Sequence, residues 1–170
     1  IPSMLFDLSN RLRSPLQKGL YRVAGPVIEK AVGLRDINAV YERAVELYHH
    51  HPAGPSAAAF FDSALKARES QYEADLPADL EIPKTGPLTV VANHPFGILA
   101  PCVLAHFIAQ QRPDVKVMAN SLLQNLPEVK PWIIPVDPFG GRGSVVKNLG
   151  PMKEALTHLR AGGTLVVFPS

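Results

Sequence analysis

The first half of the chain shows apolar residues at helical spacing, with polar residues between them. From residue 36 to residue 48 the apolar positions share one helical face, and they are Ile37, Val40, Tyr41, Ala44, Leu47 and Tyr48. Asp36 is a suitable N-terminal cap for this helix. A further helix is predicted from Ser56, a second capping residue, to about Arg68, with Phe60, Phe61, Ala64 and Leu65 in the core. We therefore expect residues 1–84 to form a helical N-terminal region.

The second half alternates short β-branched runs with helical patterns. Strands are predicted over residues 88–92, 115–118, 131–136 and 164–168. Helices are predicted over residues 98–109, 121–126 and 144–161, the last of them capped by Ser144. Pro151 interrupts this last helix and is an alternative start for its regular part. Strands that alternate with helices are typical of an α/β fold with a mainly parallel, helix-covered sheet.

The two halves are joined by residues 69–85, which are acidic, contain proline and lack a hydrophobic period. We expect residues 85–170 to form the α/β domain. With 170 residues and 46% hydrophobic content, the chain has the composition of one globular domain or part of one. It begins with Ile1 and ends on a strand-like run, so we expect a fragment whose α/β domain is truncated at its C-terminal end.

Charge and composition exclude some classes of function. The net charge is only +2, which is too small to indicate a nucleic-acid-binding protein. Residues 1–35 hold six Lys or Arg against two acids, a balance that suits either an anionic lipid surface or a solvated helical face. No run reaches the ~18 apolar residues needed to span a bilayer. Cys102 is the single cysteine and lies in an apolar helical pattern, so we expect a small buried hydrophobe in a reducing compartment.

The stretch with the clearest chemistry is Asn93-His94-Pro95-Phe96-Gly97, which stops the first predicted strand and precedes a helix. In open α/β sheets, ligands bind where a strand's carboxyl end meets the next helix N-terminus, and free N–H groups there favour negative charge. Histidine is the side chain whose ordinary pKa suits a general base near neutrality. His106 and His158 lie inside helical patterns and are expected to be structural. His49-His50-His51 is expected to be a solvated helix end rather than a metal site.

These residues resemble the first motif of the glycerolipid and lysophospholipid acyltransferases, and are most similar to the bacterial hemolysin-like acyltransferase branch. The resemblance continues through Val117–Asn120, Ile134–Arg142 and Thr164–Ser170, and covers roughly residues 87–170. It implies transfer of a fatty acyl group from a thioester, on CoA or acyl carrier protein, to a lysolipid hydroxyl. It also implies a cytoplasmic protein held peripherally at the inner face of a bacterial membrane, with no metal or other cofactor.

The resemblance also implies roles for particular residues. His94 is the expected base, and Ala100 stands near where the family places an aspartate that orients the histidine. The alternatives are that Asp137 supplies the carboxylate or that a backbone carbonyl orients the ring. Arg142, beside Gly141, is expected to hold the acceptor's anionic head group, and Lys147 is a possible assistant. The remaining expected substrate-binding residues are Asn93, Phe96, Gly97 and Ser170.

Two function classes follow from this sequence. The first is the acyltransferase, impaired by Ala100 at the usual aspartate position. The second is a non-catalytic lipid-binding or scaffolding domain that keeps the acyltransferase fold.

Overall fold

The computed structural model describes residues 34–93, 97–138 and 144–169, and for residues 34–37 and 144 it describes the backbone only. The helices are α2 (Leu34–His49), α3 (Ala57–Ala67), α4 (Leu99–Ala109) and α5 (Ser144–Arg160), with two 3₁₀ helices, η2 (Ser121–Asn125) and η3 (Lys130–Trp132). The strands are β1 (Leu88–Val91), β2 (Val115–Asn120), β3 (Ile133–Val136) and β4 (Thr164–Val167). No helix in these ranges is long and apolar enough to cross a bilayer.

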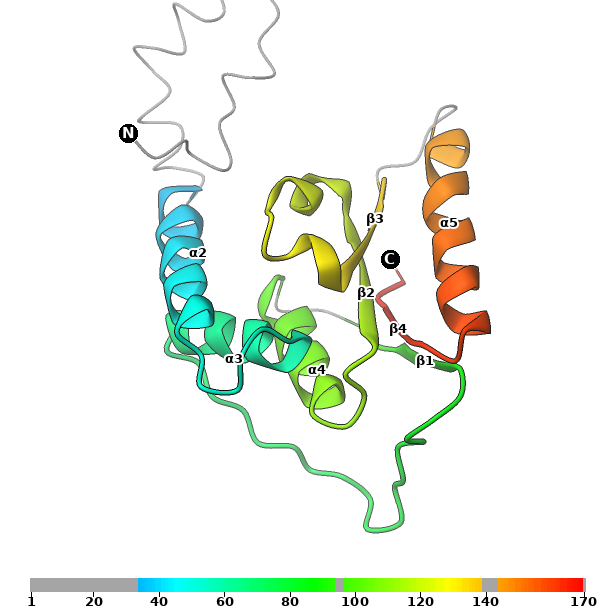
Figure 1. The fold of residues 1–170 in the computed structure, drawn as a ribbon, viewed down its shortest axis with the longest axis horizontal. Helices are drawn as coiled ribbons and strands as arrows, with labels where there is room; N and C mark the ends of the chain where they lie inside the picture. The colour runs from blue at the N-terminus through cyan, green and yellow to red at the C-terminus, as the bar shows by residue number, and fades with distance from the viewer. Residues whose placement is uncertain (1–33, 94–96, 139–143, 170) are drawn as a thin grey trace, which may run out of the picture.

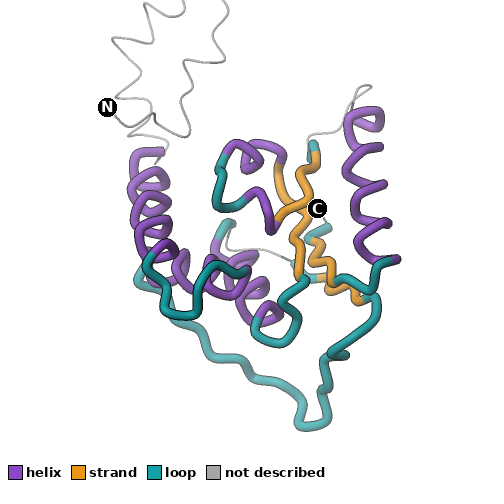
Figure 2. The backbone as a smooth tube through the Cα atoms, in the orientation of Figure 1, coloured by secondary structure: helices purple, strands orange, loops and turns teal. Residues whose placement is uncertain are grey.

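The four strands form one sheet in the order β1-β4-β2-β3, and every neighbouring pair is parallel. Helices α2, α3 and α4 lie on one side of the sheet and α5 lies on the other (Figures 1 and 2). The predicted α/β fold with a parallel, helix-covered sheet is therefore confirmed. The last of the four described strands, β4, occupies an inner position between β1 and β2.

The core has two parts because successive strand residues point to opposite faces of the sheet. In β4, Val166 packs with Phe60, Phe61 and Ile108 on the α3–α4 side. Its neighbour Leu165 packs with Ile134 and Ala155 on the α5 side. Burial on both faces explains why the β4 sequence is continuously apolar rather than alternating.

The predicted α3 helix is confirmed, including its cap. The Ser56 hydroxyl accepts a hydrogen bond of 3.1 Å from the Ala59 N–H, which satisfies one free donor of the first turn. Phe60, Phe61 and Leu65 are buried, as predicted. The cluster that contains these phenylalanines also includes residues of α4 and the sheet, so the helices before residue 84 share one core with the strands after it.

Several boundaries differ from the predictions. Pro151 lies inside α5, so the helix begins at residue 144 and the alternative start is wrong. Helix α2 begins at Leu34, before the predicted cap Asp36. Strand β2 continues two residues past its predicted end, to Asn120. The first residues predicted for β3 instead belong to η3.

Candidate functional site

The expected catalytic turn joins β1 to α4 at the carboxyl edge of the sheet. Asn93 follows β1 and is exposed, and Gly97 lies just before the helix. Gly97 has a φ of 57°, a left-handed conformation that favours glycine, although a Cβ there would have open space around it. His94 and Phe96 lie outside the described residues.

Ala100 is the second residue of α4 and is partly exposed. The first turn of α4 contains no acidic residue, and Pro101 occupies a position where a missing N–H disturbs no intrahelical hydrogen bond. The helix start that follows the turn therefore carries a methyl group where the resemblance places a carboxylate.

Asp137 and Lys147 lie together at the carboxyl end of β3. The Lys147 ammonium contacts the Asp137 carboxylate at 3.1 Å, and Asn148 exchanges two hydrogen bonds with the Asp137 backbone. Strands β1 and β3 are the two edges of the sheet, about 14 Å apart at three strand spacings. This separation argues against Asp137 as the carboxylate for the turn after β1. Gly141, Arg142 and Ser170 lie outside the described residues.

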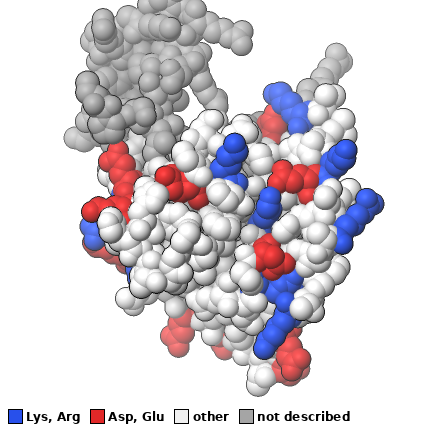
Figure 3. Space-filling model, in the orientation of Figure 1, with Lys and Arg blue, Asp and Glu red and all other residues white. Residues whose placement is uncertain are grey.

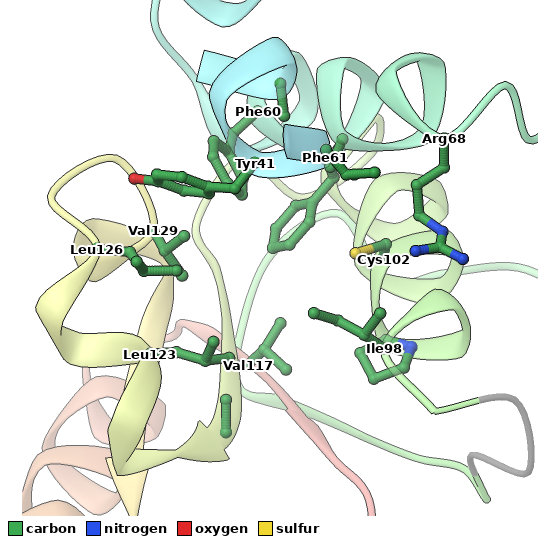
Figure 4. A pocket seen from close by; sticks show the side chains of 15 residues that line it. Tyr41, Phe60, Phe61, Arg68, Ile98, Cys102, Val117, Leu123, Leu126 and Val129 are labelled. Atoms are coloured by element: carbon green, nitrogen blue, oxygen red, sulfur yellow. The ribbon is translucent and has the colours of Figure 1, made fainter. Parts of the chain in front are cut away.

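An apolar cavity of about 120 Å³ begins beside the first turn of α4. This is roughly tenfold the space that one water molecule needs. Its walls come from α2, α3, α4, β2 and the segment that follows β2 (Figure 4). The lining residues are Val40, Tyr41, Ala44, Phe60, Phe61, Ala64, Arg68, Ile98, Pro101, Cys102, Val117, Ala119, Leu123, Leu126 and Val129.

Only two of these side chains carry an oxygen or a charge. The Tyr41 hydroxyl donates to the Glu128 carboxylate and points away from the cavity, and burial together with this hydrogen bond raises the pKa of Tyr41. The Arg68 guanidinium lies at the side of the cavity near Cys102 and Ile98, and is exposed (Figure 4). Arg68 forms no ion pair within the described ranges. The cavity therefore suits a chain-like apolar group with an anionic end.

Cys102 forms part of the cavity wall, as a small apolar side chain. Burial raises the pKa of its thiol to about 11. A thiol with this pKa is almost fully protonated at neutral pH and is a poor nucleophile. This agrees with the sequence prediction that Cys102 is a structural residue.

Phe60, Phe61 and Ala64 were predicted to lie in the core, and the cavity that they also line was not predicted. The available signal was the small size of Ala44, Ala64 and Ala119, which come from three different elements. Small side chains that face one another across an interface leave space between the elements. Their convergence depends on the tertiary fold, so the sequence pattern alone did not show it.

Outside the cavity, a cluster of polar side chains surrounds Asp62 on α3. Its carboxylate contacts His51 at 3.1 Å, Lys66 at 2.6 Å and His106 at 4.0 Å. The other ring nitrogen of His51 accepts a hydrogen bond from the Ala53 N–H, so both of its nitrogens are occupied. The prediction of a solvated end is therefore wrong for His51, whose ring closes the α2–α3 turn.

His106, predicted to be structural, lies beside Tyr72, whose hydroxyl is 2.9 Å from its Nδ1. Burial lowers the pKa of His106, which favours the neutral ring. His158 contacts the Thr164 carbonyl oxygen at 3.1 Å through Nε2. Across the described part of the chain, no group of three or more His, Cys, Asp or Glu side chains is arranged to hold a metal ion.

Comparison of the chain with protein-family models, curated proteins and solved structures finds no match.

Proposed function

We propose that this chain is an acyltransferase of the glycerolipid type. It moves a fatty acyl group from acyl-CoA or an acyl carrier protein to a hydroxyl of a lysophospholipid or similar lysolipid. The observation that supports this best is the apolar cavity, which begins at Ile98, four residues after His94. An acyl chain needs an apolar enclosure that leads to the reacting group, and burial of each CH₂ is worth ~0.8 kcal/mol.

In the proposed reaction, His94 takes the proton of the acceptor hydroxyl as its oxygen attacks the thioester carbonyl. The tetrahedral intermediate then expels the thiolate, which receives the proton. Backbone N–H groups from Phe96 to Ile98 are the proposed donors to the oxyanion, and Asn93 and Gly97 shape this turn. Arg142, with Gly141, holds the acceptor's anionic head group, and Ser170 belongs to the same binding region. Lys147 is omitted from this site because it pairs with Asp137.

Arg68 is the proposed contact for an anionic group at the mouth of the cavity. Among the described residues of the lining it is the only charged one, and its guanidinium is exposed. A donor or acceptor lipid that carries a phosphate or carboxylate satisfies both the apolar wall and this charge.

The second candidate is a non-catalytic lipid-binding or scaffolding domain. The observation that favours it is the absence of any carboxylate from the first turn of α4, where Ala100 lies. Such a domain keeps the cavity and the head-group contacts but lacks the group that stabilises an imidazolium.

One experiment separates the two candidates. Thiol release from acyl-CoA and acyl carrier protein is measured with lysolipid acceptors for the parent, Ala100→Asp and Ala100→Asn. We expect Ala100→Asp to raise turnover strongly, because loss of the equivalent carboxylate in another acyl-transfer system costs ~10⁴. The asparagine of Ala100→Asn has nearly the same shape as aspartate but no charge, so this variant should not raise turnover. His94→Ala should abolish the gain. If folded Ala100→Asp stays as inactive as the parent while the chain binds lysolipid, the non-catalytic role is favoured.

The cavity has its own test. Ala64→Trp should fill it and shift donor or ligand preference toward shorter acyl chains, measured by turnover or by binding of labelled fatty acids. Ala161→Trp is the matched control, since Ala161 is an exposed alanine outside the cavity. An unchanged chain-length preference in a folded Ala64→Trp variant removes the cavity from the proposal.

A further inference from the structure

Helix α5 carries a row of large apolar side chains that do not pack on the sheet. Val145 is 71% exposed, Leu149 62%, Met152 47% and Leu156 50%. Their spacing of four, three and four residues places them in one line along the helix. We call these four residues the α5 stripe.

The contacts of α5 show which way the stripe faces. Ala155 is buried against Ile134 and Leu165, so its side of the helix points to the sheet. Lys147 contacts Asp137 after β3 and Glu154 contacts Lys116 of β2, so these two residues mark the flank above β2 and β3. On the helical wheel the α5 stripe lies on the opposite flank, on the side of β4 and β1.

Val91 is a further exposed apolar side chain, on the edge strand β1. It is 62% exposed and pairs in register with Val167 of β4. Val167 packs against the cluster on the α5 side of the sheet. Paired residues of parallel strands project to the same face, so Val91 also projects to the α5 side.

Two cations border the α5 stripe on its outer side. Lys153 and Arg160 are exposed, and neither forms an ion pair with any described residue. The one acid of α5, Glu154, is engaged with Lys116 on the other flank. Figure 3 shows Lys and Arg side chains along the side of the molecule formed by α5. The stripe therefore combines apolar area with uncompensated positive charge.

We propose that the α5 stripe is a docking surface for an anionic phospholipid bilayer. Its apolar side chains enter the boundary between head groups and acyl chains, while Lys153 and Arg160 contact lipid phosphates. A second copy of the chain is a poorer occupant. In a two-fold pair the same patch of both copies meets at one interface, so the Lys153 and Arg160 cations of both copies come together there and repel. The docking surface does not depend on the proposed acyl transfer.

The test is co-sedimentation of the full chain with vesicles of phosphatidylcholine alone, or of equal parts phosphatidylcholine and phosphatidylglycerol. We expect binding to the anionic vesicles, weaker binding to the neutral ones, and weakening by salt. Leu149→Glu should lower affinity about tenfold or more, because it removes an inserted side chain. The double change Lys153→Glu with Arg160→Glu should lower it by at least about fivefold for each residue.

Matched controls lie elsewhere on the surface. Leu80→Glu changes a leucine that is 51% exposed, and Arg43→Glu with Lys84→Glu changes two exposed cations without ion pairs in the described ranges. The proposal requires these controls to bind like the parent. Absence of binding to anionic vesicles overturns it, as does equal loss in the controls. A solution dimer that Leu149→Glu converts to a monomer also overturns it, in favour of a second copy.

Discussion

Arg112 and Asp114 form a double hydrogen-bonded ion pair, with Nε to Oδ1 at 3.0 Å and Nη2 to Oδ2 at 2.8 Å. The Arg112 side chain is 1% exposed and the Asp114 side chain 36%. The same guanidinium donates to the carbonyl oxygens of Pro83, Gly86 and Gly162 at 2.7–2.8 Å. The Arg112 side chain therefore links the segments that precede β1, β2 and β4. These segments lie at the amino ends of the strands, and the candidate site lies at the carboxyl ends.

Arg112→Met should destabilise the fold by about 2–4 kcal/mol, since it leaves three carbonyl groups and a carboxylate without their donor. Urea unfolding measures this change. Arg160→Met is the control, because Arg160 is exposed and unpaired in the described ranges, and its change should stay within ~0.5 kcal/mol. Equal effects of the two substitutions would contradict the role given to Arg112.

The pair also predicts a pH dependence. The hydrogen bonds from Arg112 hold the pKa of Asp114 below its usual value. The pair contributes fully above the unfolded pKa, near 3.9, and its contribution is lost as pH falls through the lower folded pKa. Asp114→Asn should therefore make the acid loss of stability shallower than in the parent. Chemical denaturation between about pH 5 and pH 2 tests this, and parallel curves would show that Asp114 does not contribute.

Two glycines should respond to alanine in opposite directions. A Cβ at Gly163 would lie 2.4 Å from the His158 ring, so Gly163→Ala should displace the ring from the Thr164 carbonyl and cost about 1–3 kcal/mol. Gly150 lies inside α5 with open space around it, so Gly150→Ala should stabilise by about 0.5–1 kcal/mol. Thermal unfolding of both variants provides the comparison. A destabilised Gly150→Ala would contradict the open space around Gly150, and an unaffected Gly163→Ala would contradict the contact with the His158 ring.

Cys102 should react slowly with iodoacetamide in the native protein. Its thiol pKa of about 11 leaves little thiolate at pH 8, and the rate should still be rising at pH 10. Cys102→Ala should leave any acyl-transfer activity close to that of the parent. A loss of turnover without a loss of stability would contradict this expectation.

The helices and strands could be predicted because residues close together in the sequence determine them. The β-branched runs predicted all four strands to within two residues at each end, and Ser56 predicted the start of α3. The strand order could not be predicted, since it depends on pairings between residues such as Val91 and Val167 that are far apart in sequence. The links made by Arg112 were missed for the same reason.

The candidate site was predicted less completely. Gly97, predicted to lie in the turn after the first strand, has a left-handed conformation, and α4 follows the turn as predicted. Helix α5 was predicted, but the sequence could not show that its apolar stripe is exposed. The roles of His94, Phe96, Gly141, Arg142 and Ser170 remain predictions, because these residues lie outside the described ranges.

The inner position of β4 has a consequence for the order of folding during synthesis. Among the described strands, β1 hydrogen-bonds only to β4, and β4 is the last of the four to be made. Until residues 164–167 leave the ribosome, β1 has no neighbouring strand, and β2 and β3 can form only a two-stranded unit. The nascent chain therefore exposes the apolar faces of β1, β2 and β3 until β4 has been made, a condition that favours chaperone binding and delays cooperative folding of this sheet.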